Sequence, residues 1–372
     1  MTIRKFSVGL VLLSIVLGFQ QCSKSSDATT TTTTTGGGGG TTGGTTLQPN
    51  LPATPYNYVM TYPAHIQNAL IQNDNTPADN PLTNDGATLG RVLFYDKNLS
   101  KNNSVSCGSC HRPDQSFSDS AVFSTGFAGA LTARHSMTTL NVRFYKSGKM
   151  FWDERAASVE KQALVPIQSS VEMGLTLAEL ESRVKSLSYY PALFQKAFGS
   201  TQIDSIRIAK AIAQFERAMV TYQSKYDRVK QGIETFTTAE ATGEQLFNTP
   251  PPPPPGGGPN PPSCAGCHTP PMFITSTPAG PFTIPDANDK GINNEGRFKS
   301  GTLRNMTLRK SLFHNGSTTN VFAMLSGGPV GSPTHVPAHS VAPQDVQNLL
   351  AFMQTLNDNS IITDVKFSDP FK

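Results

Sequence analysis

Cys107-Gly108-Ser109-Cys110-His111 is the stretch that decides the fold, and it occurs a second time as Cys264-Ala265-Gly266-Cys267-His268. Two thiols three positions apart can both add to the vinyl groups of one haem, and the imidazole that follows can then ligate its iron. A four-thiolate zinc site or a pair of redox disulfides would use the same cysteines, but neither needs a histidine directly after each pair. The sequence therefore predicts two covalently attached c-type haems. Their attachment residues are Cys107, Cys110, His111, Cys264, Cys267 and His268.

The length and charge of the chain limit the classes of function open to it. Its 372 residues are enough for two domains. The formal net charge is only +4 and no basic stripe is visible, so nucleic acid is not expected as a partner. Five cysteines are present and the two motifs use four, which leaves Cys22.

The N-terminal segment has the pattern of an export signal. Arg4 and Lys5 precede an apolar run over residues 8–19, which is too short to span a membrane, and Cys22 follows it. This resembles a bacterial lipoprotein signal, so residues 1–22 are predicted to be a signal peptide with a lipid anchor at Cys22. The alternative is an ordinary cleaved secretory signal with an incidental cysteine. Both interpretations place the protein in the periplasm, and the first attaches it to a membrane.

Low-complexity sequence marks two segments outside any core. Residues 29–46 are only Thr and Gly, so residues 23–50 are predicted to be a flexible tether. Residues 250–262 are a Pro/Gly insertion just before the second motif, and they are predicted to be an extended, exposed loop.

Capping signals and apolar periodicity predict helices along most of the remaining chain. Thr176 and Glu179 form a capping box for a helix that runs to about residue 187, and Pro191 opens another helix that Gly199 ends. A second capping box, at residues 237 and 240, opens the helix before the second motif. Spacings of four and three predict one long helix ending near residue 232, with the apolar face Ile208, Ile212, Phe215, Met219, Tyr222 and Tyr226.

The last predicted helix begins at Pro343. Its apolar face is Val346, Leu349, Leu350, Met353 and Leu356. Strand signals are nearly absent. The predicted fold is therefore mostly α, with two tandem cytochrome c-like haem domains over residues 51–235 and 236–372.

Between the motifs, residues 151–156 read FWDERA, and a Gln, a Pro and a Glu follow at residues 162, 166 and 172. With the two haem motifs in this order, residues 80–357 resemble the bacterial diheme cytochrome c peroxidases and the related diheme enzyme that matures methylamine dehydrogenase. The resemblance implies that the first haem is peroxidatic. It also implies an active face built from Gln162, Pro166 and Glu172, with Trp152 passing electrons between the haems.

Elementary chemistry agrees with these roles. Peroxide must lose a proton from one oxygen and gain one on the other, which a carboxylate such as Glu172 can accomplish, and an amide such as Gln162 can orient it. The ordinary alternatives are an acid at a helix N-terminus for Glu172, a surface polar residue for Gln162 and a core anchor for Trp152.

The resemblance also implies a methionine as sixth ligand of the second haem, which raises its potential. In the family this ligand lies shortly before a Gly-Gly pair and after an FHxG segment, here residues 313–316. Met324 fits that place, and Met306 and Met353 are competitors, of which Met353 has the pattern of a core residue. No tyrosine lies near, which separates the chain from the relative that uses a tyrosine ligand.

Two positions depart from the family pattern. Phe127 stands where many members place a loop histidine that closes the first haem, so we expect that haem to be open in the oxidised protein. His135 stands where the family has an asparagine that helps to bind calcium, which argues against the calcium ion that the resemblance implies.

The function implied by the resemblance is the reduction of hydrogen peroxide to water, with electrons from a small cytochrome c or cupredoxin. A homodimer is implied as well. The alternatives are a diheme oxidase that modifies a protein or small molecule, and a plain diheme electron carrier.

Overall fold

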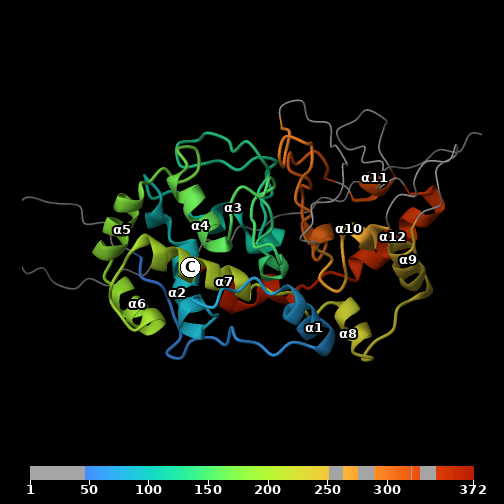
Figure 1. Cartoon of the computed structure of the whole chain (residues 1–372), viewed down its shortest axis with the longest axis horizontal. Helices are drawn as coiled ribbons and strands as arrows, with labels where there is room; N and C mark the ends of the chain where they lie inside the picture. Colours follow the sequence, from blue (N-terminus) through green and yellow to red (C-terminus); the bar gives the residue numbers. More distant parts are fainter. Residues whose placement is uncertain (1–46, 251–262, 275–288, 320, 327–340) are drawn as a thin grey trace, which may run out of the picture. The chain divides into compact units, whose positions relative to one another are not determined.

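The computed structural model describes residues 47–250, 263–274, 289–319, 321–326 and 341–372. Within these ranges the chain is helical, and its only β-pairing consists of isolated bridges (Figure 1). The predicted signal peptide, the lipid anchor at Cys22, most of the predicted tether and the Pro/Gly insertion lie outside the described residues. No described helix has the length and apolar character needed to cross a membrane.

The helices of the first half come in the order α1 to α8, with three short 3₁₀ turns (η). Their bounds are α1 Ala64–Asn73, α2 Asn84–Tyr95, η1 Lys97–Leu99, α3 Cys107–Cys110, η2 Pro113–Gln115, η3 Val142–Phe144, α4 Val159–Gln168, α5 Leu177–Ser186, α6 Tyr190–Phe198, α7 Ser205–Ala218 and α8 Lys225–Lys230. Those of the second half are α9 Thr238–Asn248, α10 Cys264–Cys267, η4 Met306–Leu308, α11 Val321–Leu325, α12 Pro343–Gln354, α13 Ser360–Thr363 and η6 Val365–Phe367.

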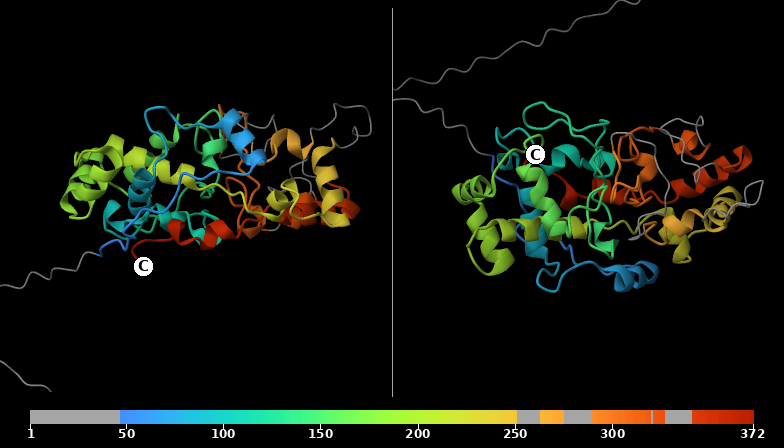
Figure 2. Two further views of the ribbon diagram at one scale, coloured as in Figure 1. Left: turned by 90° about the horizontal axis from the view of Figure 1, so that it is seen from below. Right: turned by 45° about the horizontal axis from the view of Figure 1, so that its top comes forward.

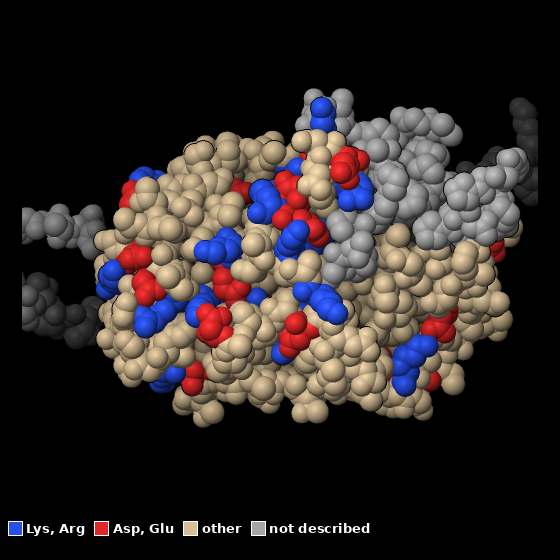
Figure 3. Space-filling model, in the orientation of Figure 1, with Lys and Arg blue, Asp and Glu red and all other residues tan. Residues whose placement is uncertain are grey.

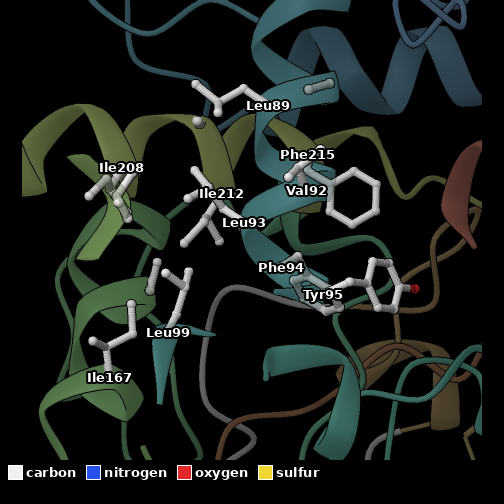
Figure 4. Packing of buried hydrophobic residues seen from close by; sticks show 14 of the residues in the cluster. Leu89, Val92, Leu93, Phe94, Tyr95, Leu99, Ile167, Ile208, Ile212 and Phe215 are labelled. Atoms are coloured by element: carbon white, nitrogen blue, oxygen red, sulfur yellow. The ribbon is translucent and has the colours of Figure 1, made fainter. Parts of the chain in front are cut away.

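A crossed helix pair forms the main core of the first half. Helix α2 lies against α7, and a Cβ at Gly90 would overlap the carbonyl oxygen of Ala211, so only glycine allows the two backbones to come this close. Figure 4 shows Val92 and Leu93 of α2 together with Ile212 of α7 in this apolar cluster. The first haem motif comes after α2 and the short turn η1.

The second half contains a similar pair of helices that cross closely at a glycine. Helix α9 crosses α12, and a Cβ at Gly243 would overlap the carbonyl oxygen of Asn348. The second motif follows α9 as the first follows α2. Phe247 and Phe352 are buried between the two helices, with ring centroids 5.4 Å apart. A motif behind a crossed helix pair therefore occurs twice, as two tandem cytochrome c-like units require.

The predicted helix boundaries are confirmed in most places. Thr176 caps α5 in a capping box with Glu179, and Gly199 ends α6 in a left-handed conformation with φ of 69°. The capping box before α9 and the start of α12 at Pro343 are also as predicted. On α12 Val346, Leu349 and Met353 are buried, whereas Leu350 is only half-buried and Leu356 lies beyond the helix end.

The prediction of one long helix that carries Ile208 to Tyr226 and ends near residue 232 is wrong. Helix α7 ends at Ala218, and α8 begins only at Lys225. Between the two helices, side chains from distant segments accept hydrogen bonds from backbone amides that would otherwise donate to carbonyls within a helix. The amide of Thr221 donates to Asn141 Oδ1 at 3.0 Å, and the amides of Tyr222 and Gln223 both donate to Asp358 Oδ2 at 2.9 Å.

The C-terminal segment returns to the core of the first half. Tyr95 Oη donates to the carbonyl of Phe367 at 2.6 Å, and Arg91 Nε donates to the carbonyl of Ser368 at 2.7 Å. Both views in Figure 2 show the red C-terminal segment running toward the teal and green helices. The domain limits 51–235 and 236–372 remain a prediction, and the last dozen residues pack on the first of these two ranges.

Candidate haem sites and the residues around them

The first motif forms the short helix α3. Ser106 precedes it in a capping box with Ser109, and the amide of His111 donates to the carbonyl of Cys107 at 2.9 Å. A Cβ at Gly108 would overlap the ring of Tyr95, so the glycine lets α3 sit directly on the end of α2. Cys107 and Cys110 form no disulfide. Burial raises the pKa of Cys110 to about 11, so its sulfur is a protonated thiol at neutral pH.

The His111 ring is oriented by a backbone carbonyl. Ser116 and Phe117 both have positive φ, 54° and 56°, and this turn brings the Phe117 carbonyl back to 3.2 Å from His111 Nδ1. With Nδ1–H donating there, the Nε2 lone pair is left for a metal. Burial also lowers the pKa of His111, which favours the neutral imidazole that ligates iron.

The second motif has the same local form with a different partner. The amide of His268 donates to the carbonyl of Cys264 at 2.8 Å, and His268 Nδ1 lies 3.1 Å from Ser300 Oγ. That hydroxyl donates onward to the carbonyl of Cys267 at 3.3 Å. Tyr145 Oη donates to the carbonyl of Ser300 at 2.9 Å and so holds the serine in place.

These groups fit two c-type haems. In each motif two unpaired thiols and one imidazole with an oriented Nδ1 lie within five residues on one short helix. This is the set that a covalently bound haem requires. A four-thiolate zinc site does not fit as well, because no group of three or more His, Cys, Asp and Glu within the described ranges is placed to hold a metal ion.

The predicted active-face residues lie on α4 and in the turn after it. Gln162 and Pro166 are one helical turn apart, and the proline has no N–H to give to the Gln162 carbonyl. The amide of Met173 donates back to the Pro166 carbonyl at 3.2 Å, which folds the turn carrying Glu172 onto the end of α4. The structure therefore brings Gln162, Pro166 and Glu172 onto one local framework.

Glu172 lies close to the first motif. It is half-buried, and burial raises the pKa of its carboxyl, opposed by the charge of Arg155. Besides burial, the charge of Glu172 contributes to the raised pKa of both Cys107 and Cys110. The carboxyl is thus within electrostatic reach of the thiols that would carry the first haem.

Phe127 covers the turn that contains Glu172. Its amide donates to the carbonyl of Glu172 at 2.9 Å, and its ring lies where a Cβ at Gly174 would stand. Gly126 is packed against the carbonyl of Val171 in the same way. The loop is therefore held against the turn that carries Glu172, and the place of Phe127 as the lid position of the first haem stays a prediction from spacing.

Trp152 is not placed with Glu172 but joins the two halves of the chain. Its Nε1 donates to the carbonyl of His135 at 2.8 Å, and the amide of His135 donates to the carbonyl of His314 at 2.7 Å. The rings of Trp152 and His314 are in edge contact, with centroids 6.4 Å apart, and His314 stacks on Phe298 at 3.6 Å. Sequence reasoning used His314 only as part of the FHxG pattern and missed this stack.

The place predicted for calcium is occupied by an ion-pair network. Arg134 pairs with Asp153 at 2.7 Å and with Asp289 at 2.5 Å. His135 is buried, and its Nδ1 lies 3.0 Å from the carbonyl of Val122. The prediction that His135 argues against a calcium ion here is not tested by these contacts.

The sixth-ligand candidates share one environment. Met324 on α11 is 4% exposed, and so are Met306 and Met353. All three belong to the same apolar cluster as Phe273 and Leu325. Burial therefore does not choose among them, and the assignment of Met324 stays a prediction from spacing.

Comparisons with known proteins agree with this arrangement. Residues 84–235 match the family model for di-haem cytochrome c peroxidase. Among curated relatives, methylamine utilization protein MauG of Methylophilus methylotrophus is 32% identical over 258 residues, which is 65% of this chain and 71% of the relative. Cytochrome c551 peroxidase of Nitrosomonas europaea is also 32% identical, over 256 residues, 65% of this chain and 72% of the relative.

Solved structures give the same result. The crystal structure of a MauG-like protein associated with microbial copper homeostasis has a TM-score of 0.70 and 26% identity, and the match covers 85% of this chain and all of that one. The diheme peroxidase BthA from Burkholderia thailandensis, at 20% identity and a TM-score of 0.59, shares the fold over 78% of this chain and 91% of its own. The chain belongs to the di-haem cytochrome c peroxidase and MauG family.

Proposed function

We propose that this protein reduces hydrogen peroxide to two molecules of water, using two protons and two electrons from a small cytochrome c or cupredoxin. The observation that carries the proposal is the position of Glu172, a half-buried carboxyl with a raised pKa beside the thiols of the first motif. Family membership implies two haems, here held by Cys107, Cys110 and His111 and by Cys264, Cys267 and His268. When bound, they supply iron that accepts electrons and activates peroxide.

The side chains around the first motif have separate roles in this proposal. The Gln162 amide donates a hydrogen bond that orients peroxide, and Pro166 shapes the end of α4 so that Glu172 faces the same region. Glu172 takes a proton from one peroxide oxygen and returns it to the other. Burial suits it for this, because its carboxyl stays protonated to a higher pH than that of an exposed glutamate.

The second half serves electron entry in this proposal, with Met324 as sixth ligand of its haem. Trp152 and His314 are then part of the route that electrons take toward the first half. Aromatic rings in contact provide such a route, and the hydrogen bonds at His135 hold this pair rigidly. On the face shown in Figure 3, basic and acidic side chains are interspersed. The sequence features of residues 1–46 support a lipid-anchored, periplasmic protein.

A second candidate is an oxidase that acts on a protein or small molecule. Its support is the MauG relative, which is as similar to this chain as the peroxidase relative is. The absence of a tyrosine near the predicted sixth-ligand position argues against it.

Steady-state oxidation of a reduced small cytochrome, measured with and without hydrogen peroxide, separates these functions. A peroxidase oxidises the cytochrome only when peroxide is present, with two equivalents consumed for each peroxide. An electron carrier oxidises it stoichiometrically and then stops. An oxidase shows peroxide consumption that depends on a third substrate rather than on the cytochrome, and that result would refute the proposal.

A further inference from the structure

Two basic side chains, Lys299 and Arg309, lie beside Tyr145. Burial lowers the pKa of Lys299 to about 7, and the charge of Glu154 opposes this shift. Lys299 is 3% exposed, its Nζ lies 3.5 Å from the centroid of the Tyr145 ring, and it donates to the carbonyl of Lys149. Arg309 donates from Nη2 to the carbonyl of Thr302 at 2.9 Å, while its buried Nε has no hydrogen-bond partner. Neither cation forms an ion pair with a carboxylate among the described residues.

Two fully buried arginines do have acidic partners, whereas the buried Arg91 donates to the carbonyl of Ser368 instead. Arg217 is 1% exposed and pairs with Glu160 at 2.5 Å, and the fully buried Arg304 pairs with Asp227 at 2.7 Å. A buried guanidinium is costly unless an anion and hydrogen bonds compensate for its lost hydration. Burial lowers the pKa of Arg309 to about 10, so the group still carries its charge at neutral pH. The described residues therefore supply no ion-pair partner for Arg309.

The position of the two basic side chains indicates which anion would pair with Arg309. Tyr145 donates to the carbonyl of Ser300, and the hydroxyl of Ser300 lies against Nδ1 of His268, the predicted iron ligand. The Arg309 charge acts on Tyr145, since it opposes the rise in the pKa of Tyr145 that burial causes. The cations thus flank the loop that orients the second motif's histidine. Haem brings two propionate carboxylates wherever it binds.

We infer that Arg309, through Nε and with Lys299 beside it, binds a propionate carboxylate of the haem attached at Cys264 and Cys267. Charge-assisted hydrogen bonds of this kind are about twice as strong as neutral ones, and the planar guanidinium suits a carboxylate. A positive charge at a propionate favours the reduced haem, so Arg309 raises the potential of the second haem. This inference rests on the haem attachment in the proposed function and adds a residue that sets the potential.

The test is an EPR-monitored redox titration of the full chain, produced in a host that attaches c-type haem, in which the two haems are followed separately. The variants are Arg309→Gln, Arg309→Lys and, as matched control, Lys310→Gln, which removes a charge from the exposed neighbouring residue. In Arg309→Gln we expect the reduced-to-oxidised ratio of the second haem at fixed potential to fall about tenfold, a shift of 59 mV for one electron. Arg309→Lys keeps the charge but lacks Nε, so it should fall between wild type and Arg309→Gln, and Lys310→Gln should match wild type.

Several results would overturn the inference. One is an unchanged potential of the second haem in Arg309→Gln. If that variant does not accumulate, an unchanged potential of the second haem in Arg309→Lys is the contradicting result. A shift confined to the first haem would assign the propionate to the other cofactor, and a wild-type potential that varies with added phosphate would identify a free anion instead. Melting temperature gives a separate readout: the loaded Arg309→Gln protein should melt lower, because a propionate loses its partner, and a higher melting temperature would mean that no anion is bound. A pyridine hemochrome count below two haems in wild type would instead refute the attachment itself.

Discussion

Replacement of Glu172 by glutamine tests the proposed proton transfer most directly. The amide has almost the size of the carboxyl but neither accepts nor releases a proton near neutral pH. The local backbone does not depend on the side chain, because the Glu172 amide donates to the carbonyl of Ser169 at 3.2 Å and its carbonyl accepts from Phe127 at 2.9 Å. We therefore expect Glu172→Gln to fold normally and to carry both haems.

The size of the effect follows from the environment of the carboxyl. Glu172 is half-buried, and burial raises the pKa of its carboxyl above that of an exposed glutamate, a shift that the charge of Arg155 only partly opposes. A well-placed general acid–base group contributes about 10²–10⁴-fold to a rate. Turnover with peroxide should fall by this factor, which corresponds to about 2.7–5.5 kcal/mol in the activation free energy.

The assay is peroxide-dependent oxidation of a reduced cytochrome, measured across pH. In wild type the rate should change with pH as Glu172 titrates, at a pH above that at which an exposed glutamate titrates. The variant should lack this change in rate. Glu181→Gln is the matched control, since Glu181 lies on α5 and accepts from the Ser205 amide at 2.8 Å, which an amide oxygen also does. Full turnover in Glu172→Gln with both haems present would remove Glu172 from the mechanism.

Three further outcomes are expected. Because Phe127 offers no ligand nitrogen, the first haem of the oxidised protein should give a high-spin EPR signal, and a clean bis-histidine low-spin spectrum would contradict this. Ser300→Ala removes the acceptor at His268 Nδ1, weakens that ligand as a donor and should raise the potential of the second haem by up to about 59 mV, as seen by spectroelectrochemistry. Burial raises the pKa of Glu216 from 4.5 to about 8, so the free energy of unfolding should fall as pH rises through this range. This loss of stability is at most about 5 kcal/mol, and it should be absent in Glu216→Gln when the free energy of unfolding is measured by urea titration at several pH values. The same pH dependence in wild type and variant would show that Glu216 does not cause it.

Local sequence signals predicted much of this fold because their physical causes are local. The capping box of Thr176 and Glu179 and the left-handed Gly199 each depend on residues within one helical turn. The helix break after Ala218 could not be predicted in this way. It depends on Asn141 and Asp358, which are 80 and more than 130 residues away and supply the hydrogen bonds that replace the helix.

In the candidate site, too, features that depend on local spacing could be predicted from the sequence, and features that depend on distant residues could not. The attachment residues and the Gln, Pro and Glu of the proposed active face could be predicted because each set has fixed spacing along the chain. Arg309 had no such signal, since an arginine in sequence says nothing about whether an acid will face it. Only the structure shows that Glu160 pairs with Arg217 and Asp227 with Arg304, while no carboxylate in the described part of the chain pairs with Arg309.

The two motifs share their cysteines and histidine, yet their histidines have different partners. The Phe117 carbonyl that accepts from His111 is fixed by a left-handed turn and can only accept. The Ser300 hydroxyl beside His268 can rotate, and it also donates to the carbonyl of Cys267. A carbonyl acceptor holds the imidazole more firmly as an electron donor than a hydroxyl that shares its own proton elsewhere. The first iron should therefore receive the stronger push toward its oxidised state, and the second, with a weaker donor and a cation beside it, should favour reduction. In the proposed function, electrons that enter at the second half would be retained there until peroxide reaches the first, and this difference would begin with two hydrogen bonds that the motifs themselves do not encode.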